Sequence, residues 1–236
     1  MAGVPFDDVL GLADDALILG HRLSEWCGHA PLLEEELSLA NIGLDLIGQA
    51  RALYDYAGAI EGKGRDQDAL AYLRDAPQFH NLLLVEQPNG DFAMTIARQF
   101  LYSTYAAPFW RATAGSKDTT LAGIAATAQH EVAYHLRHSG EWLVRLGDGT
   151  EESHRRAQDA IDYLWPYTGE MLEGDNASLR REWDETVAGV LDEATLKRPK
   201  DGWMQTGGRL GRHSEHLGHI LAALQFLQRA YPGASW

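Results

Sequence analysis

The hydrophobic and polar positions of the chain follow a helical pattern along most of its length. Clusters of Gly and Pro leave long stretches between them, and none of these stretches alternates apolar and polar residues as a strand would. The pattern therefore predicts an all-α protein. The predicted helices cover residues 7–26, 33–60, 66–74, 91–113, 118–146, 151–172, 178–190 and 213–230.

The lengths of the helices and of their connections indicate how they pack. Four long helices are expected over residues 7–26, 33–60, 91–113 and 118–146. Short connections join the members of each pair, and a crossover of about 30 residues joins the two pairs. This arrangement is typical of the ferritin-like four-helix bundle. We expect such a bundle, with additional C-terminal helices, as a single domain over residues 1–236.

Particular residues mark where helices begin and how the pairs are connected. The acidic run 34–36 favours the N-terminus of the second helix through the helix dipole. Asp91 can cap the helix that follows, and Asp118 or Thr119 begins the next one. The apolar run 82–85 predicts an ordered, packed connection between the two helix pairs.

Composition and charge narrow the class of function. The 236 residues carry a formal net charge of −14, which disfavours nucleic-acid binding and is compatible with a basic protein partner. No apolar run is long enough to span a membrane, and residues 1–8 lack the features of a signal peptide. The single cysteine, Cys27, cannot form an internal disulfide and is expected to be buried. We expect a cytoplasmic protein that binds neither nucleic acid nor membrane.

The helix over residues 33–60 combines an apolar surface with one row of polar residues. Its apolar residues lie almost all round the helix, which predicts burial on several sides. Asn41, Asp45 and Gln49 recur every four residues and therefore share a face. Since a buried carboxylate needs a cation or strong hydrogen-bond donors, this row predicts a polar site inside the protein.

Two further helices carry the residue types of a di-iron site. Glu131 and His135 lie one turn apart, and Glu215 and His219 repeat this spacing near the C-terminus. In ferritin-like di-iron proteins, two helices each provide a Glu and two others each provide a Glu-x-x-His motif. For the first pair we favour a hydrogen bond on the helix, and for the histidine-rich cluster 213–219 a solvated or interface face.

The ligand set for iron is nevertheless incomplete. The helix over residues 91–113 contains no Asp or Glu and offers Arg98 instead, and Tyr134 stands where a Glu-x-x-His motif from Glu131 would need histidine. We therefore predict no metal, no cofactor and no catalytic residue on this chain. We hypothesise a relict polar core in which Arg98 or a histidine neutralises a carboxylate, either Asp45 or Glu131. Its candidate members are Asn41, Asp45, Gln49, Arg98, Glu131 and His135.

Several longer strings of the sequence resemble one known family. They are RLSEWCGHAP (22–31), ANIGLDLIGQAR (40–51), NLLLVEQPNGDFA (81–93), YHLRHSGEWLVRLGDGT (134–150) and HSEHLGHIL (213–221). These strings are spread over nearly the whole chain. In them the sequence resembles the C subunits of phenylacetyl-CoA 1,2-epoxidase complexes, the phenylacetate-CoA oxygenases.

The resemblance implies a function that the residues alone do not give. It implies a structural, non-catalytic, ferritin-like subunit of a multicomponent monooxygenase that epoxidises the ring of phenylacetyl-CoA in bacterial phenylacetate degradation. The di-iron centre and the acyl-CoA site would belong to a separate catalytic subunit, which this chain stabilises, and a reductase would deliver the electrons. A homodimer is a further expected form of the isolated chain. No catalytic or interface position carries over, although Trp236 is a candidate docking residue.

Three other functions fit parts of the sequence. The chain could be a ferritin-like di-iron oxidase with an atypical ligand set of Glu25, Asp45, Glu131 and His135. The segment GGRLGR at 207–212 could cradle the phosphates of coenzyme A, although a turn is the simpler interpretation. A helical storage protein would instead assemble into a large shell.

Overall fold

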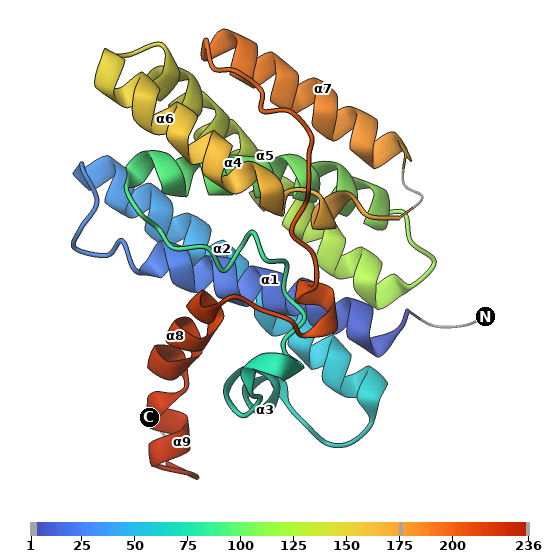
Figure 1. Ribbon diagram of the computed structural model, residues 1–236. Helices are drawn as coiled ribbons and strands as arrows, with labels where there is room; N and C mark the ends of the chain where they lie inside the picture. Colours follow the sequence, from blue (N-terminus) through green and yellow to red (C-terminus); the bar gives the residue numbers. More distant parts are fainter. Residues whose placement is uncertain (1–3, 175–176, 235–236) are drawn as a thin grey trace. The chain divides into compact units, whose positions relative to one another are not determined.

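The computed structural model describes residues 4–174 and 177–234, and these residues fold into helices (Figure 1). Nine α-helices lie in the described ranges, which contain no strand, so the all-α prediction is confirmed. The chain divides into two compact units. Unit 1 consists of Met1–Gln87 together with Gly207–Trp236, and unit 2 consists of Pro88–Thr206. The single domain predicted over residues 1–236 stays a prediction, and Trp236 lies outside the described residues.

Unit 1 is built on two long helices that pack side by side. Gly20 on the first and Gly43 on the second let their backbones approach, because a Cβ atom on Gly20 would lie 3.1 Å from the Gly43 carbonyl oxygen. Three shorter helices complete the unit. Its helices are α1 (Phe6–Ser24), α2 (Leu33–Glu61), α3 (Gln67–Tyr72), α8 (Glu215–Leu224) and α9 (Phe226–Ala230).

Unit 2 is organised around its first helix. Its helices are α4 (Phe92–Thr113), α5 (Thr119–Gly147), α6 (Glu151–Leu164) and α7 (Ala177–Glu193). α4 contacts each of the other three, and its residues 95–106 are all buried. On α7 the buried Trp183 donates its ring N–H to the Leu101 carbonyl oxygen of α4 at 3.2 Å. α4 thus forms the centre of this unit.

The predicted cap of α4 is confirmed, and of the two candidate starts of α5 it is Asp118 that caps the helix. The Asp91 carboxylate accepts the Met94 N–H at 3.0 Å, and the Asp118 carboxylate accepts the Leu121 N–H at 3.0 Å. Such side-chain acceptors satisfy amide groups that the first turn of a helix leaves without a backbone partner. At the other end of α2, Gly62 adopts a left-handed conformation (φ 67°) that closes the helix.

Two predicted helices are shorter than expected. The helix predicted over residues 151–172 ends at Leu164, and two 3-10 turns, Trp165–Tyr167 and Glu170–Leu172, follow it. Pro166 explains the change, since its ring nitrogen cannot donate the next helical hydrogen bond. The helix predicted over residues 213–230 begins only at Glu215 and is interrupted at Gln225.

Two predictions about burial differ from the structure. α2 was predicted to be buried on several sides, but one of its faces is exposed, where Leu33, Leu37 and Leu44 are 71%, 58% and 66% exposed. Their spacing places them on one face of the helix, while Leu39, Leu46 and other residues of the opposite face are fully buried. Cys27 is exposed as well, since it lies in the turn after α1 rather than in the helix.

The connection that follows α3 is ordered, as predicted. Leu82, Leu83, Leu84 and Val85 are all buried, so this non-helical run belongs to the core of unit 1.

Within the described residues, none of the helices has both the length and the apolar character needed to cross a membrane.

Candidate functional site

The polar row predicted on α2 runs from the surface into the core. Asn41 is exposed, Asp45 is half-buried and Gln49 is buried. Asn41 shares its face with the exposed leucines of this helix, because Leu37 and Leu44 lie one turn to either side of it. Only the C-terminal part of the row therefore has the burial of an interior polar site.

The other three candidates for the polar core lie in unit 2. Arg98 on α4 and His135 on α5 are fully buried, and Glu131 is half-buried. The Arg98 guanidinium donates to the Asn89 side-chain oxygen at 2.6 Å, which ties α4 to the turn before it. Three of the six candidates thus come from each unit, and the relict polar core stays a prediction.

The donor groups of this chain do not fit a di-iron centre. Such a centre in a helical bundle takes carboxylates from each of four helices. α4 has no Asp or Glu along its whole length, and the charged side chain buried in it is the cation Arg98. Within the described ranges, no group of three or more His, Cys, Asp and Glu side chains is placed to hold a metal ion.

Unit 1 contains buried ionic groups that the sequence pattern did not identify. Asp14 is fully buried in the middle of α1, where the hydroxyl of Tyr54 donates to it at 2.5 Å and the His80 N–H at 2.8 Å. Arg74, at the end of α3, forms an ion pair with this carboxylate and lies over the Phe79 ring. Burial, and then the charge of Asp14, raise the pKa of Tyr54 well above its usual value. The phenol therefore stays protonated and serves as a donor.

The neighbouring Asp15 has a different cation. Its carboxylate accepts the Leu82 N–H at 2.7 Å and pairs with the Arg209 guanidinium at 2.6 Å. Gly11 leaves room for this arginine, because a Cβ atom there would lie 2.8 Å from the guanidinium. Burial raises the pKa of Asp15 to about 6, and Arg209 only partly offsets that effect.

A third buried carboxylate, Glu86, fixes the start of the C-terminal segment. It accepts the Ser214 N–H at 2.7 Å, and its second oxygen lies 2.8 Å from Nδ1 of His213 and 2.9 Å from the Asn81 amide nitrogen. Arg22 of α1 donates to the Glu86 backbone carbonyl at 2.7 Å. Of the solvated or interface face expected for the 213–219 cluster, the solvated alternative is wrong for His213, whose side chain is only 4% exposed.

These three carboxylates form one buried ionic network of unit 1. They join α1, the end of α3, the connection through residues 79–87 and the segment after residue 207. Each carboxylate is held by a cation or by several N–H donors, so the network suits a rigid scaffold better than proton transfer to a substrate. The one sequence signal for it was the adjacent pair Asp14–Asp15 inside the otherwise apolar run LADDALILG.

Residues of two alternative functions are engaged elsewhere. Glu25, a member of the atypical iron-ligand set, forms an ion pair with Arg22 at 3.0 Å. Arg209, which was to bind the phosphates of coenzyme A, is paired with buried Asp15. Gly211 is in the left-handed conformation, and a Cβ atom there would lie 2.2 Å from the Pro77 carbonyl oxygen. The segment 207–212 is thus a packed turn, and the first of its two arginines, Arg209, already has a counter-charge.

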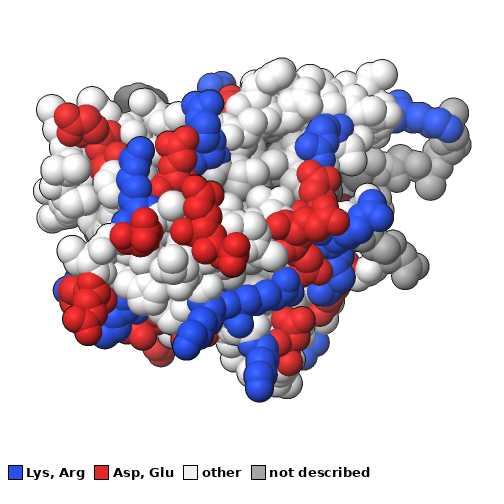
Figure 2. Space-filling view, turned by 90° about the horizontal axis from the view of Figure 1, so that it is seen from above, with Lys and Arg blue, Asp and Glu red and all other residues white. Residues whose placement is uncertain are grey.

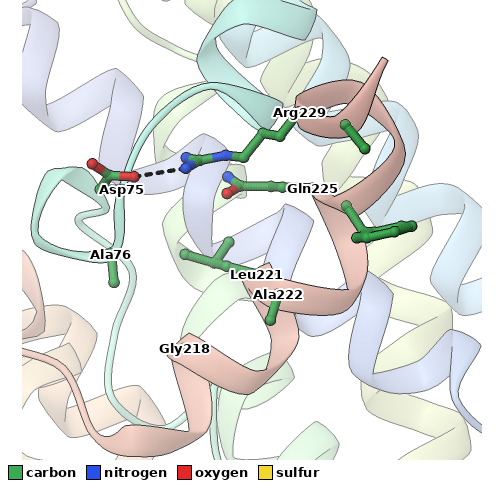
Figure 3. Close-up of a pocket in the computed structure, with 9 residues that line it drawn as sticks. Asp75, Ala76, Gly218, Leu221, Ala222, Gln225 and Arg229 are labelled. Atoms are coloured by element: carbon green, nitrogen blue, oxygen red, sulfur yellow. Dashed lines mark hydrogen bonds and ion pairs between the residues drawn. The ribbon is translucent and has the colours of Figure 1, made fainter. Parts of the chain in front are cut away.

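A shallow pocket lies where the C-terminal helices meet the turn after α3 (Figure 3). Leu221 and Ala222 line it with Phe226, and an ion pair between Arg229 and Asp75, at 2.8 Å, closes one side. Gln225 anchors the helix end by donating to the Ala71 and Arg74 carbonyl oxygens. Because its lining is mainly apolar and its ion pair is satisfied, the pocket suits an apolar side chain of a partner better than it suits a catalysed reaction.

The surface carries both signs of charge close together. In Figure 2, acidic and basic side chains lie beside one another across the face in view. On α6, for example, Glu152 pairs with Arg155 at 2.9 Å and with Arg156 at 2.6 Å. The negative net charge is therefore not concentrated in one large patch on this face.

Comparison with known proteins identifies the family. Residues 5–236 match the family described as Phenylacetic acid catabolic protein, and the chain belongs to it. The family is ferritin-like, which confirms the fold class predicted from the helix lengths. The chain is 47% identical over 241 residues to the C subunit of 1,2-phenylacetyl-CoA epoxidase from Escherichia coli (strain K12), a match that covers 96% of this chain and 97% of that protein. The resemblance found in the sequence is thus confirmed.

Proposed function

We propose that this chain is the C subunit of a phenylacetyl-CoA 1,2-epoxidase that acts in phenylacetate catabolism. The observation that carries the proposal is the 47% identity, which extends over nearly the full length of both proteins. In this role the chain is a structural subunit that stabilises a separate catalytic subunit and has no catalytic residue of its own.

The donor groups support the assignment of the iron to the partner. Iron in an oxygenase of this kind would activate oxygen for insertion into the aromatic ring. α4 supplies no carboxylate to such a centre, and Arg98 is buried in that helix. We therefore place the di-iron centre, and with it the acyl-CoA site, on the catalytic subunit. A reductase and further subunits would complete the complex, which we place in the cytoplasm.

The exposed face of α2 is the surface that we assign to the catalytic subunit. Leu33, Leu37 and Leu44 together make an apolar row on a helix whose opposite side is in the core. An exposed row of large apolar side chains is costly in water and is a common mark of a protein contact. Toward the C-terminal end of the same face, the exposed residues become polar, with Arg51 and Asp55. The face is thus mainly apolar toward its N-terminal end, apart from Asn41, and polar toward its C-terminal end, and protein interfaces also combine apolar and polar areas.

Co-expression with the catalytic subunit tests the proposal. We expect the two proteins to elute together in size-exclusion chromatography, with iron present in the complex and absent from this chain alone. Epoxidation of phenylacetyl-CoA by the reconstituted complex should require both subunits. About two irons bound to the isolated chain would instead support the di-iron oxidase, because that is the number a ferritin-like centre holds. A shell of many copies would support a storage protein.

Paired substitutions test the proposed contact face. Leu37→Glu together with Leu44→Glu should abolish co-elution while circular dichroism and thermal unfolding of the isolated chain stay unchanged, because both side chains are already exposed. Ala126→Glu, which adds a charge at an exposed position of α5, is the matched control and should leave the complex intact. Co-elution of the leucine variant would show that the partner binds elsewhere, even if the subunit assignment holds.

A further inference from the structure

Two stretches of chain cross between the units, and both are fastened at one place in unit 1. The first crossing follows Gln87 and the second precedes Gly207. Glu86 is the last residue but one before the first crossing, and residues 207–214 follow the second directly. The Glu86 carboxylate binds His213 and the Ser214 N–H, so it joins the two stretches to each other.

The hydrogen bonds of the His213 ring determine its protonation. Its Nε2 lies 2.8 Å from the Phe79 carbonyl oxygen, and its Nδ1 lies 2.8 Å from a Glu86 carboxylate oxygen. A carbonyl oxygen can only accept, so Nε2 must carry a hydrogen. Nδ1 can then donate to the carboxylate only if the ring is a doubly protonated imidazolium. A neutral ring in this position would instead direct a lone pair at the carboxylate.

The groups around Glu86 favour the proton on the histidine. The carboxylate also accepts from the Ser214 N–H and the Asn81 amide, and donors of this kind stabilise its ionised form. Both side chains are almost completely buried, His213 at 4% and Glu86 at 0% exposure. The ion pair therefore forms in a region where water cannot replace a lost partner.

The surroundings of His213 raise its pKa overall. Burial by itself lowers the pKa of His213, but the hydrogen bonds to Glu86 and Phe79 and the charges of Glu86 and Asp14 outweigh it, and the pKa is raised. On α1, Arg22 donates to the Glu86 backbone carbonyl and pairs with Glu25. Asp14 is itself paired with Arg74, and Asp15 with Arg209.

We propose that Glu86 and His213 form a proton-dependent clasp that fastens both chain crossings to unit 1, and that loss of the proton releases the segment around residues 211–216. Deprotonation replaces one hydrogen bond with repulsion between two lone pairs, and the ring must turn away from Glu86. Arg209, which stays charged at every relevant pH, continues to hold the start of the segment through Asp15. The release is therefore local and begins at His213.

Nuclear magnetic resonance on the full chain tests the clasp. We expect both ring nitrogens of His213 to show the chemical shifts of an imidazolium at pH 7. Above the titration of this ring, the hydrogen-exchange protection factor of the Ser214 amide, corrected for the intrinsic rate, should fall by about tenfold or more, which corresponds to roughly 1.4 kcal/mol. Glu86→Gln should move the titration of His213 below the ordinary histidine range, because it removes the negative charge and its amide NH2 can donate to a neutral ring nitrogen.

A control variant and a second substitution separate the clasp from general stability. His219→Gln changes an exposed histidine of the same helix region and should leave the Ser214 protection and its pH dependence unchanged. His213→Gln should lower the protection of Ser214 at all pH values and remove its pH dependence. A His213 ring that is neutral at pH 7 in the wild type, or a Ser214 protection factor that stays constant through the titration, would overturn the proposal.

Discussion

Asp14 and Arg74 form a buried ion pair that joins the middle of α1 to the end of α3. Arg74 Nη1 lies 3.0 Å from Asp14 Oδ2, and the two side chains are 3% and 0% exposed. Tyr54 of α2 donates to the same carboxylate, so three helices of unit 1 meet at one charge. Because neither ion can recover water if its partner is lost, the unit should be sensitive to changes in this pair.

Removal of one ion of this pair should strongly destabilise the protein. Arg74→Met retains most of the side-chain volume but leaves the Asp14 charge buried, and we expect a loss of about 3–5 kcal/mol in the free energy of unfolding. Urea titration followed by circular dichroism measures it. Arg229→Met is the matched control, since its ion pair with Asp75 is 41% and 73% exposed and should contribute less than about 1 kcal/mol.

A double variant separates the charge from the packing. Asp14→Asn in the Arg74→Met background removes the buried charge and should recover part of the lost stability. If Arg74→Met and Arg229→Met had equal effects, the buried pair would be no more important than a surface pair.

The pH dependence of stability should reveal Asp15. Its pKa of about 6 in the folded protein lies above the value of 3.8 for a free side chain, so the folded state binds the proton more tightly. The stabilising contribution of this group is therefore fully present below pH 3.8 and is lost as the pH rises through about 6. With about 1.4 kcal/mol for each pKa unit, the loss amounts to roughly 3 kcal/mol.

Comparison of the wild type with Asp15→Asn isolates this contribution from the other carboxylates. The difference in free energy of unfolding, wild type minus variant, should fall by about 2–3 kcal/mol between pH 4 and pH 7. Urea titrations at a series of pH values provide it. A difference that increases with pH would mean that Arg209 lowers the pKa of Asp15 instead, against the effect of burial.

Helix positions could be predicted from the sequence because the signals that begin and end helices are local. Asp91 and Asp118 accept hydrogen bonds from amides two or three residues away, so both partners of each hydrogen bond are close together in the sequence. The buried ionic network could not be predicted in this way. Asp14 and Arg74 lie 60 residues apart, and Asp15 and Arg209 lie 194 residues apart, so only the folded chain brings each pair together.

For the candidate polar core, too, some features could be predicted from the sequence and others could not. Arg98 and His135 were named from the sequence as candidates for a polar core, and both are buried. The exposure of Leu37 and Leu44 could not be predicted, because an apolar residue on the surface can have the same sequence pattern as one in the core.

The hypothesis of a relict polar core predicts that Arg98 is needed for stability. Arg98→Met should lower the free energy of unfolding by about 3 kcal/mol, because Arg98 is fully buried and the hypothesised carboxylate partner would lose its cation. Arg111→Met, at an exposed position of the same helix, is the control and should cost less than about 1 kcal/mol. Unchanged stability of Arg98→Met would refute the hypothesis.

A double-mutant cycle then identifies the carboxylate that Arg98 neutralises. If it is Glu131, the effects of Arg98→Met and Glu131→Gln should be non-additive by about 0.5 kcal/mol or more. The same cycle with Asp45→Asn tests the other candidate. Additive effects in both cycles would contradict the proposed neutralisation, even if Arg98 itself contributes to stability.

Two glycines of α5 should respond oppositely to substitution by alanine. A Cβ atom on Gly147 would lie 2.2 Å from the Ala194 carbonyl oxygen and 2.9 Å from the Ala194 Cβ, where the segment after α7 packs against the end of α5. Since the obstructing atom belongs to the backbone, it cannot move aside as a flexible side chain could. Gly147→Ala should therefore lower the free energy of unfolding by about 1–3 kcal/mol.

Gly123, in the same helix, has no heavy atom within 4 Å of its added Cβ. Gly123→Ala should therefore stabilise the protein by about 0.5–1 kcal/mol through the higher helix propensity of alanine. Thermal and urea unfolding of both variants measure the difference, and a stabilising Gly147→Ala would show that α5 and the segment after α7 are not in close contact.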